Sequence, residues 1–248
     1  DELTEEQSEI LQQWQDMAVF MKPPEKQVAE DLTAYSGDYA GIVAHRAPMV
    51  LMMQTQGTLG FIIWRVGGLM LLGMALMKLG ILSGTRDPAF YRRMMAVGYG
   101  LGLPIVGLGA WNIYLHDWEM FWMFQVGGLP NYVGSLLVGM GHIALVMTVM
   151  QSGFMPNLMR RFSAVGRMAF TNYLLHSIIL TTVFYGYGFG LYGEVPRFWQ
   201  MGFVIAVIGF QLWLSPWWLA RFRFGPAEWL WRSLTYWRLQ PMRHAVAL

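Results

Sequence analysis

The chain has 248 residues, of which 55% are hydrophobic and only 13% charged, and it contains no cysteine. Soluble domains carry about 25% charged residues, so this composition indicates a membrane protein. The lack of cysteine excludes disulfides, thiolate nucleophiles and thiolate metal sites. The net charge of +2 conceals an uneven distribution, because residues 1–40 hold ten acidic residues whereas residues 220–248 hold five arginines.

The N-terminal segment, residues 1–47, is expected to be an acidic helical region outside the cytoplasm. Apolar residues recur at helical spacing over 4–21, which predicts an amphipathic helix that ends before Pro23. A second, more polar helix is expected over 25–40. Because the chain starts at Asp1 without an initiator methionine or a signal peptide, we interpret it as the C-terminal part of a longer protein or as a processed product.

Residues 48–219 are predicted to form a transmembrane helical bundle. Its first part is apolar and is interpreted as an approach helix over 48–62 and a spanning helix over 65–82, or as one long kinked helix. The further spans have the length of about 20 residues that a bilayer demands, and they cover 91–111, 131–151, 167–187 and 198–219. The predicted fold class is therefore all-α: a polytopic bundle of about five spanning helices, with amphipathic interfacial helices at both ends.

The charges of the connectors predict the topology by the positive-inside rule. Connectors 83–92 and 152–166 carry arginines, connector 112–130 carries acidic residues, and connector 188–197 is neutral. The tail over 220–248 is basic and rich in tryptophan, so we expect a cytoplasmic interfacial helix there. These signs place the C terminus in the cytoplasm and the acidic N-terminal segment on the opposite side.

A polar cluster in the 167–187 span is the strongest candidate for a ligand site, since polar side chains inside a span need a partner or a purpose. Asn172 and His176 are four residues apart and share one helix face, with Arg167 one turn away and Tyr173 nearby. This cluster could bind an anionic or carbonyl-containing ligand, and the imidazole could move a proton. The alternative is that these side chains only hold helices together through interhelical hydrogen bonds.

Further candidates lie on other segments. His142 in the middle of the 131–151 span is the second candidate for catalysis, and Gln211 is a candidate for substrate binding. Three arginines are candidates for binding phosphate or lipid headgroups, namely Arg160, Arg161 and Arg232. The position of the basic tail directly after a span favours lipid headgroups over nucleic acid. No metal site is expected, because His116 with Asp117 and Glu119 is too local a set and neither His142 nor His176 is close to it in sequence.

Two local pairings are also expected. Gly98 and Gly102, and likewise Gly186 and Gly190, match the spacing of small residues at which membrane helices pack closely, a pattern that arises easily in a chain with 28 glycines. Glu228 and Arg232 are spaced to form an ion pair one turn apart on the C-terminal helix.

Four sequence segments resemble the C-terminal region of the YeiB-like bacterial membrane proteins, the family that carries the domain of unknown function 418. The two longest segments are Gly166–Ser177 and Phe222–Tyr236, and the shorter ones are Phe184–Gly188 and Leu214–Pro216. The resemblance covers residues 40–248. It implies a multi-pass protein of the bacterial inner membrane.

The resemblance also implies an activity, because this family is grouped with transmembrane acyltransferases. These enzymes pass an acyl group from cytoplasmic acyl-CoA to a hydroxyl or amine on the other side of the membrane. We therefore expect an acyltransferase-like enzyme with His176 or His142 as general base and acyl-CoA as a substrate, without a permanently bound cofactor. His176 departs from the family pattern, in which Gln is frequent. The alternatives are a small-molecule transporter and an accessory subunit of a membrane complex.

The resemblance further implies partners. The family's N-terminal half, with an Asp and an Arg-Gly motif on its first helix, is not in this sequence. The lipid bilayer, this N-terminal half or a partner membrane subunit are therefore the expected partners, and self-association is compatible with the sequence.

Overall fold

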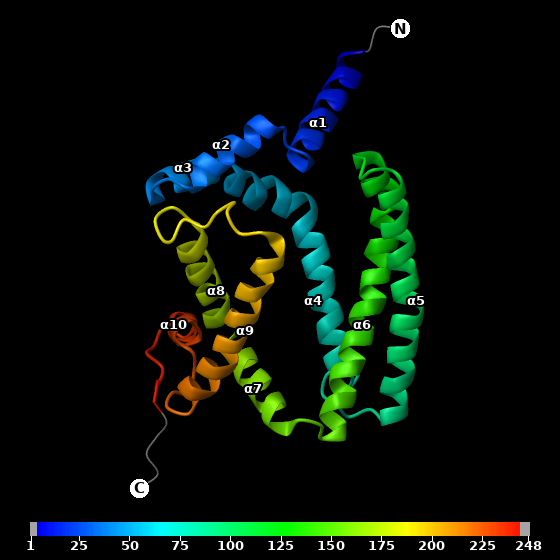
Figure 1. Cartoon of the computed structure of the whole chain (residues 1–248). Coiled ribbons are helices and arrows are strands. Elements are labelled where there is room, and N and C mark those ends of the chain that lie inside the picture. The colour runs from blue at the N-terminus through cyan, green and yellow to red at the C-terminus, as the bar shows by residue number, and fades with distance from the viewer. Residues whose placement is uncertain (1–3, 244–248) are drawn as a thin grey trace. The chain divides into compact units, whose positions relative to one another are not determined.

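The computed structural model describes residues 4–243, which form helices and connectors with one isolated β-bridge (Figure 1). The chain divides into two compact units. The first unit takes the chain up to Gln27 together with Met52–Phe154, and the second takes Val28–Leu51 together with Met155–Leu248. The all-α fold class is thus confirmed.

The first unit is built around a long helix pair, α5 and α6, which lie side by side (Figure 1). The N-cap of α5 is Asp87, whose carboxylate accepts a hydrogen bond from the Phe90 N–H at 3.3 Å. Pro88 follows at the first helical position, where a missing N–H does no harm. The elements of this unit, of which η1 and η2 are π-helical, are α1 (Glu5–Met21), η1 (Met53–Ile62), α4 (Ile63–Lys78), α5 (Pro88–Leu115), η2 (Trp122–Val126) and α6 (Gly128–Ser152).

Glycines allow α5 and α6 to approach closely. A Cβ on Gly98 would lie 2.7 Å from backbone atoms of Gly141 and from the carbonyl oxygen of Leu137. One turn further along α5, Gly102 faces Val138 in the same way. Both Gly98 and Gly102 of the predicted packing pattern therefore lie in the helix contact.

Tyr91 organises the core of the first unit. Its side chain is 0% exposed, and its hydroxyl donates a hydrogen bond to the Ile81 carbonyl oxygen at 2.7 Å. Leu76 and Ala144 complete this buried cluster. Because a buried hydroxyl is costly unless it is hydrogen-bonded, this contact holds the connector between α4 and α5 against the start of α5.

The second unit contains the elements that position the candidate site. In Figure 1, α2, α3 and the connector between α8 and α9 lie at one end of this unit, and α7 lies at the other. We call these the α3 end and the α7 end. The elements are α2 (Glu25–Tyr35), α3 (Tyr39–Met52), α7 (Pro156–Arg167), α8 (Ala169–Phe184), α9 (Arg197–Leu219) and α10 (Pro226–Thr235).

The segment predicted as one span over 167–187 is divided at Met168. This residue has φ −113° and ψ 28°, which separates α7 from α8, and it is 1% exposed in a core with Ala164 and Leu219. Arg167 therefore ends α7 and does not continue the face of α8 as predicted.

Glu228 of α10 caps the N-terminus of α8. The Thr171 backbone N–H donates to one oxygen of the Glu228 carboxylate at 3.0 Å, and the Thr171 hydroxyl donates to the other. Negative charge is stabilising at this end of a helix. The predicted ion pair between Glu228 and Arg232 is not formed: the guanidinium of Arg232 lies over the Phe224 ring, 4.7 Å from its centroid.

Within the described residues, three helical runs are long and apolar enough to cross a membrane: Pro88–Leu115, Trp122–Ser152 and Arg197–Leu219. A fourth is counted if Tyr39–Gly60 and Ile63–Lys78 are taken as one broken span. Helix α8 is apolar but has only 16 residues. The count of about five spans therefore stays a prediction.

Candidate functional site

A buried hydrogen-bond network joins α8 to α9. Asn172, 4% exposed, donates from Nδ2 to the Val165 carbonyl oxygen and to Ser215 Oγ, both at 3.1 Å. Gln211, 5% exposed, donates from Nε2 to the Asn172 carbonyl oxygen at 3.0 Å and to His176 Nδ1 at 3.2 Å. The structure thus brings together three predicted site residues, Asn172, Gln211 and His176.

This network assigns a hydrogen-bonding role to His176. Because the Gln211 amide nitrogen is a donor, His176 Nδ1 must accept, and the ring hydrogen is on Nε2. His176 therefore offers an N–H donor to a ligand, while the lone pair on Nδ1 is engaged.

His142, in α6 of the first unit, has the opposite arrangement. Its Nδ1 lies 2.8 Å from the Val138 carbonyl oxygen and therefore carries the ring hydrogen, which leaves a lone pair on Nε2. The ring packs edge-on against Tyr99, with centroids 5.3 Å apart. Of the two predicted candidates for general base, His142 has the available lone pair that this role requires.

The amide oxygen of Asn172 is buried without a hydrogen-bond partner. Leaving a buried acceptor unpaired costs about 1–3 kcal/mol, so Oδ1 is the point at which the network can accept a further hydrogen bond. Tyr173 stands apart from this network, because adjacent residues point to different sides of a helix. Its side chain is 69% exposed.

Two of the predicted cations meet in a cavity at the α7 end. Arg160 and Arg167 lie two turns apart on α7 and line a cavity of about 340 Å³, which we call the Arg160 cavity. Arg167 also donates to the Arg223 carbonyl oxygen at 3.4 Å. The cavity contains no carboxylate, so it suits a phosphate group. Its other lining residues are Ser163, Ala164, Pro216, Leu219 and Ala220.

The other two predicted phosphate-binding arginines lie outside the Arg160 cavity. Arg161 donates to the Leu212 carbonyl oxygen of α9 at 3.1 Å. Arg232 lines a separate cavity of about 400 Å³ with Phe170, Glu228 and Trp231. The three arginines therefore occupy three different environments.

A second polar site, which was not predicted from the sequence, lies at the α3 end. Arg46 Nη1 of α3 donates to the Tyr185 hydroxyl oxygen at 2.7 Å. Tyr185 is the C-cap residue that directly follows α8, so this hydrogen bond joins α3 to the end of α8.

The Arg46–Tyr185 pair borders a cavity of about 750 Å³ between α3 and α8, which we call the Arg46 cavity. The hydroxyls of Ser177, Thr181 and Thr182 also line it, but each donates to a backbone carbonyl of α8. The remaining lining is apolar or aromatic: Tyr39, Ile42, Val43, Ala47, Val50, Leu51, Ile178 and Tyr187.

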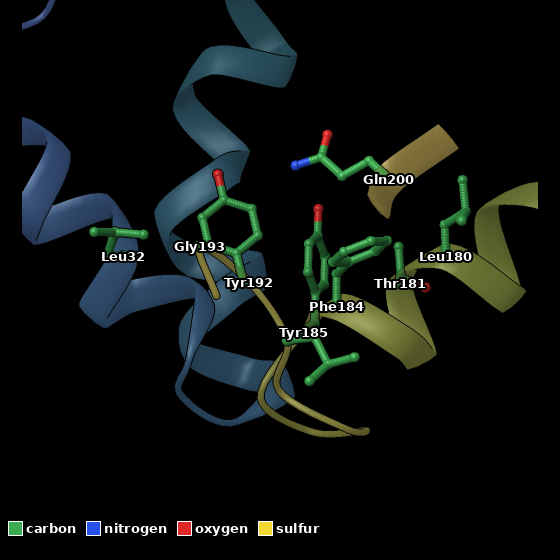
Figure 2. Close-up of a pocket in the computed structure, with 9 residues that line it drawn as sticks. Leu32, Leu180, Thr181, Phe184, Tyr185, Tyr192, Gly193 and Gln200 are labelled. Atoms are coloured by element: carbon green, nitrogen blue, oxygen red, sulfur yellow. The ribbon is translucent and has the colours of Figure 1, made fainter. Parts of the chain in front are cut away.

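A neighbouring cavity of about 500 Å³, the Tyr192 cavity, shares Tyr185 and Thr181 with the Arg46 cavity. Figure 2 shows the hydroxyl ends of Tyr185 and Tyr192 directed toward the side on which the Gln200 amide lies. Gln200 Nε2 donates to the Val195 carbonyl oxygen at 3.0 Å, and its amide oxygen is left for another partner. The apolar part of the lining is Leu32, Leu180, Phe184, Leu191 and Gly193.

Tyr35 of α2 holds the connector between α8 and α9 in place. Its ring stacks on Tyr192 at 4.4 Å and tilts against Tyr185 at 5.2 Å, measured between centroids. Its carbonyl oxygen accepts from the Gly186 N–H at 2.9 Å. A side chain on Gly186 would collide with the Ser36 backbone, so only glycine allows this close approach.

A His–Asp pair supports the same end. His45 Nε2 of α3 lies 2.7 Å from Asp31 Oδ1 of α2. Both side chains are more than a third exposed, so the pair orients the helices more than it stabilises the fold. Among the described residues, no group of three or more His, Asp or Glu side chains is placed to hold a metal ion.

Burial raises the pKa of Tyr185 above its ordinary value of 10.0, against the smaller opposing effect of the Arg46 guanidinium. Burial likewise raises the pKa of Tyr192. Both phenols therefore stay protonated near neutral pH. Because the Tyr185 oxygen already accepts from Arg46, its O–H is left to donate to another acceptor.

Taken together, the helices define an all-α chain with apolar helices that suit a membrane and with cationic cavities at both ends of one unit. The chain belongs to the DUF418 family, because the family model described as "Protein of unknown function (DUF418)" matches residues 76–238. The resemblance drawn from the sequence segments is thus confirmed.

Three relatives are similar to parts of this chain. "Uncharacterized protein YeiB" of Escherichia coli (strain K12) is 37% identical over 181 residues, which cover 69% of this chain and 44% of YeiB. "Uncharacterized protein YxaH" of Bacillus subtilis (strain 168) is 41% identical over 157 residues, 63% of this chain and 37% of YxaH. An "Uncharacterized 39.9 kDa protein in amylase 3'region" of Bacillus acidopullulyticus is 29% identical over 124 residues, 50% of this chain and 34% of that protein.

The chain therefore spans less than half the length of each of these relatives. No solved structure matches it.

Proposed function

We propose that this chain forms the ligand-binding part of a membrane acyltransferase-like enzyme, which moves an acyl group from cytoplasmic acyl-CoA to an acceptor on the other side. The observation that carries the proposal is the placement of cavities at the two ends of α9. Gln200 near its start lines the Tyr192 cavity, and Leu219 at its end lines the Arg160 cavity. The 19 helical steps from Gln200 to Leu219 rise about 28 Å, close to the hydrocarbon thickness of about 30 Å.

The charges of the connectors assign the two ends to the two faces of the membrane. The arginines of α7 and the basic tail favour a cytoplasmic α7 end, by the positive-inside rule. On this orientation the C terminus is cytoplasmic, the α3 end faces outward, and the membrane is the bacterial inner membrane. Acyl-CoA then approaches from the side of the Arg160 cavity, whose two guanidinium groups suit its phosphates.

The reaction is an acyl transfer. The thioester C–S bond of acyl-CoA breaks, and the acyl carbon forms a C–O or C–N bond with a hydroxyl or amine acceptor. The acceptor's proton passes through a general base to the CoA thiolate. His142 in the first unit and His176 in the second are alternative candidates for the residue that acts on the reacting groups. His142 has the available Nε2 lone pair that a general base needs, whereas His176 Nε2–H, oriented by Gln211, can donate to the oxyanion that develops on the acyl carbonyl.

A structural role is the second candidate function. Asn172, Gln211 and His176 bond to one another and to helix backbone, and none of the cavities described above is lined by them. Polar side chains at such positions can serve helix association alone.

The acyltransferase proposal is tested by release of free CoA. Inside-out membrane vesicles that contain the chain are given acetyl-CoA or palmitoyl-CoA, and the new thiol is measured with a thiol reagent. The chain has no cysteine, so it contributes no background. We expect release above that of vesicles without the chain, and a loss of about tenfold or more in the double variant Arg160→Gln/Arg167→Gln, because charge-assisted phosphate contacts are removed.

Arg238→Gln is the matched control, since this arginine also belongs to the C-terminal part and lines none of these cavities. Release equal to that of empty vesicles, from both acyl-CoAs, would contradict the proposal and favour the structural role.

A further inference from the structure

Arg46 brings an uncompensated positive charge to the Arg46 cavity. Among the described residues no carboxylate forms an ion pair with it. The nearest acids in sequence are engaged elsewhere: Asp31 bonds to His45, and Asp38 accepts from the Gly41 N–H at 3.1 Å. Because the Tyr185 phenol is protonated near neutral pH, it does not neutralise the guanidinium.

Arg46 and Tyr185 place hydrogen-bond donors at the polar edge of this cavity. A guanidinium has five N–H groups, and the contact with Tyr185 uses one side of Arg46. The Tyr185 oxygen accepts from Arg46, so its O–H is left to donate to a ligand. The hydroxyls of Ser177, Thr181 and Thr182 already donate to α8 carbonyls. A group that only accepts hydrogen bonds and carries negative charge, an oxyanion, therefore fits the polar edge.

The rest of the lining is apolar or aromatic. It includes Ile42, which is 2% exposed, and the side chains of Val43, Val50 and Ile178. The volume of about 750 Å³ lies within the range of ligand sites. A hydrocarbon chain buried there is stabilised by about 25 cal/mol for each Å² removed from water. The apolar lining therefore suits a hydrocarbon tail, whereas Arg46 and Tyr185 suit an anionic head group.

We propose that the Arg46 cavity binds an amphiphile with an oxyanion head, a phosphate or a carboxylate, and a hydrocarbon tail. The head lies against Arg46 and Tyr185, and the tail lies between α3 and α8. Since Tyr185 also lines the Tyr192 cavity, a bulkier head extends into that cavity. This inference rests on the proposed function, because it names the class of ligand for the site at the α3 end.

The test is binding of defined amphiphiles to the purified chain in a nonionic detergent. Dodecyl phosphate and dodecanoate carry the two heads, dodecanol carries none, and inorganic phosphate has no tail. A ligand that binds the folded state raises the thermal midpoint in a saturable way. We expect such a rise with dodecyl phosphate, dodecanoate or both, and the one that binds more tightly identifies the head. Dodecanol and inorganic phosphate should bind more weakly than the preferred anionic amphiphile, by about tenfold or more.

The variant Arg46→Gln should lose this preference and bind dodecyl phosphate and dodecanol alike. Arg197→Gln, which removes a charge from the start of α9 outside these cavities, should keep it. If Arg46→Gln does not fold, Tyr185→Phe serves instead, since it keeps the ring and removes the hydroxyl. Equal binding of charged and neutral amphiphiles by the unaltered chain, or a preference unchanged in Arg46→Gln or Tyr185→Phe, would overturn the inference.

The two proposals fail in different ways. Preferential amphiphile binding without CoA release keeps the site and rejects the acyltransferase. CoA release with no preference for an anionic amphiphile keeps the acyltransferase and rejects this ligand.

Discussion

At the scale of single residues, hydrogen-bond partners decide what each candidate can do. Asn172 and His176 were predicted to share a face, and this follows from helical spacing alone. That Gln211 joins them, and that it engages Nδ1 of His176, depends on the contact between α8 and α9. Residue types and spacing were therefore enough to locate the cluster. The roles of His176 and His142 could be assigned only once their hydrogen-bond partners were known.

The Arg46–Tyr185 pair could not be predicted from the sequence for the same reason. The two residues are 139 positions apart and are joined by one hydrogen bond. Two features of the sequence pointed weakly to this end: a cation just before the apolar stretch and the tyrosines of the connector between α8 and α9. Neither feature says which side chains meet.

The phenol of Tyr185 should titrate late. Burial raises the pKa of this phenol in the folded chain above 10.0. The unfolded chain therefore loses the proton at a lower pH than the folded chain does. The stability that the protonated phenol contributes is complete below pH 10 and decreases as the pH rises to the pKa of the folded chain. We expect the phenolate absorbance of the folded chain minus that of Tyr185→Phe to have a midpoint above 10. A difference spectrum with its midpoint at or below 10.0 would contradict the burial of this phenol.

At the scale of elements, apolar periodicity located the helices well and their breaks poorly. The predicted spans over 91–111 and 198–219 correspond to α5 and α9. The break at Met168 was missed, because it depends on packing against Ala164 and Leu219 and on the cap that Glu228 provides from α10. Neither contact is local in sequence.

The contact between α5 and α6 gives a matched pair of substitutions. Gly98→Ala places a methyl group 2.7 Å from the Gly141 backbone and should cost about 1–3 kcal/mol, the usual range for overpacking. Gly100→Ala meets nothing within 4 Å and should be neutral or slightly stabilising, because alanine is the better helix former. Thermal midpoints in detergent distinguish the two, and equal midpoints would show that the helices are not in this close contact.

At the scale of the whole molecule, composition was sufficient for the all-α class and for apolar helices that suit a membrane. Composition did not determine the number of spans, because α8 has only 16 residues and the apolar stretch over 48–82 divides among α3, η1 and α4. The family was recognisable from short segments, but the chain covers less than half of its relatives. The activity of the whole protein is therefore a proposal that rests on the sites of one unit.

The central claim is that the two ends of this unit face opposite sides of a membrane. Single cysteines test it directly, because the chain has none of its own. Ser36→Cys marks the α3 end and Ser163→Cys marks the Arg160 cavity. We expect a maleimide that does not cross membranes to label only position 36 in spheroplasts. In inside-out vesicles it should label only position 163. Labelling of both positions from the same side would contradict the claim.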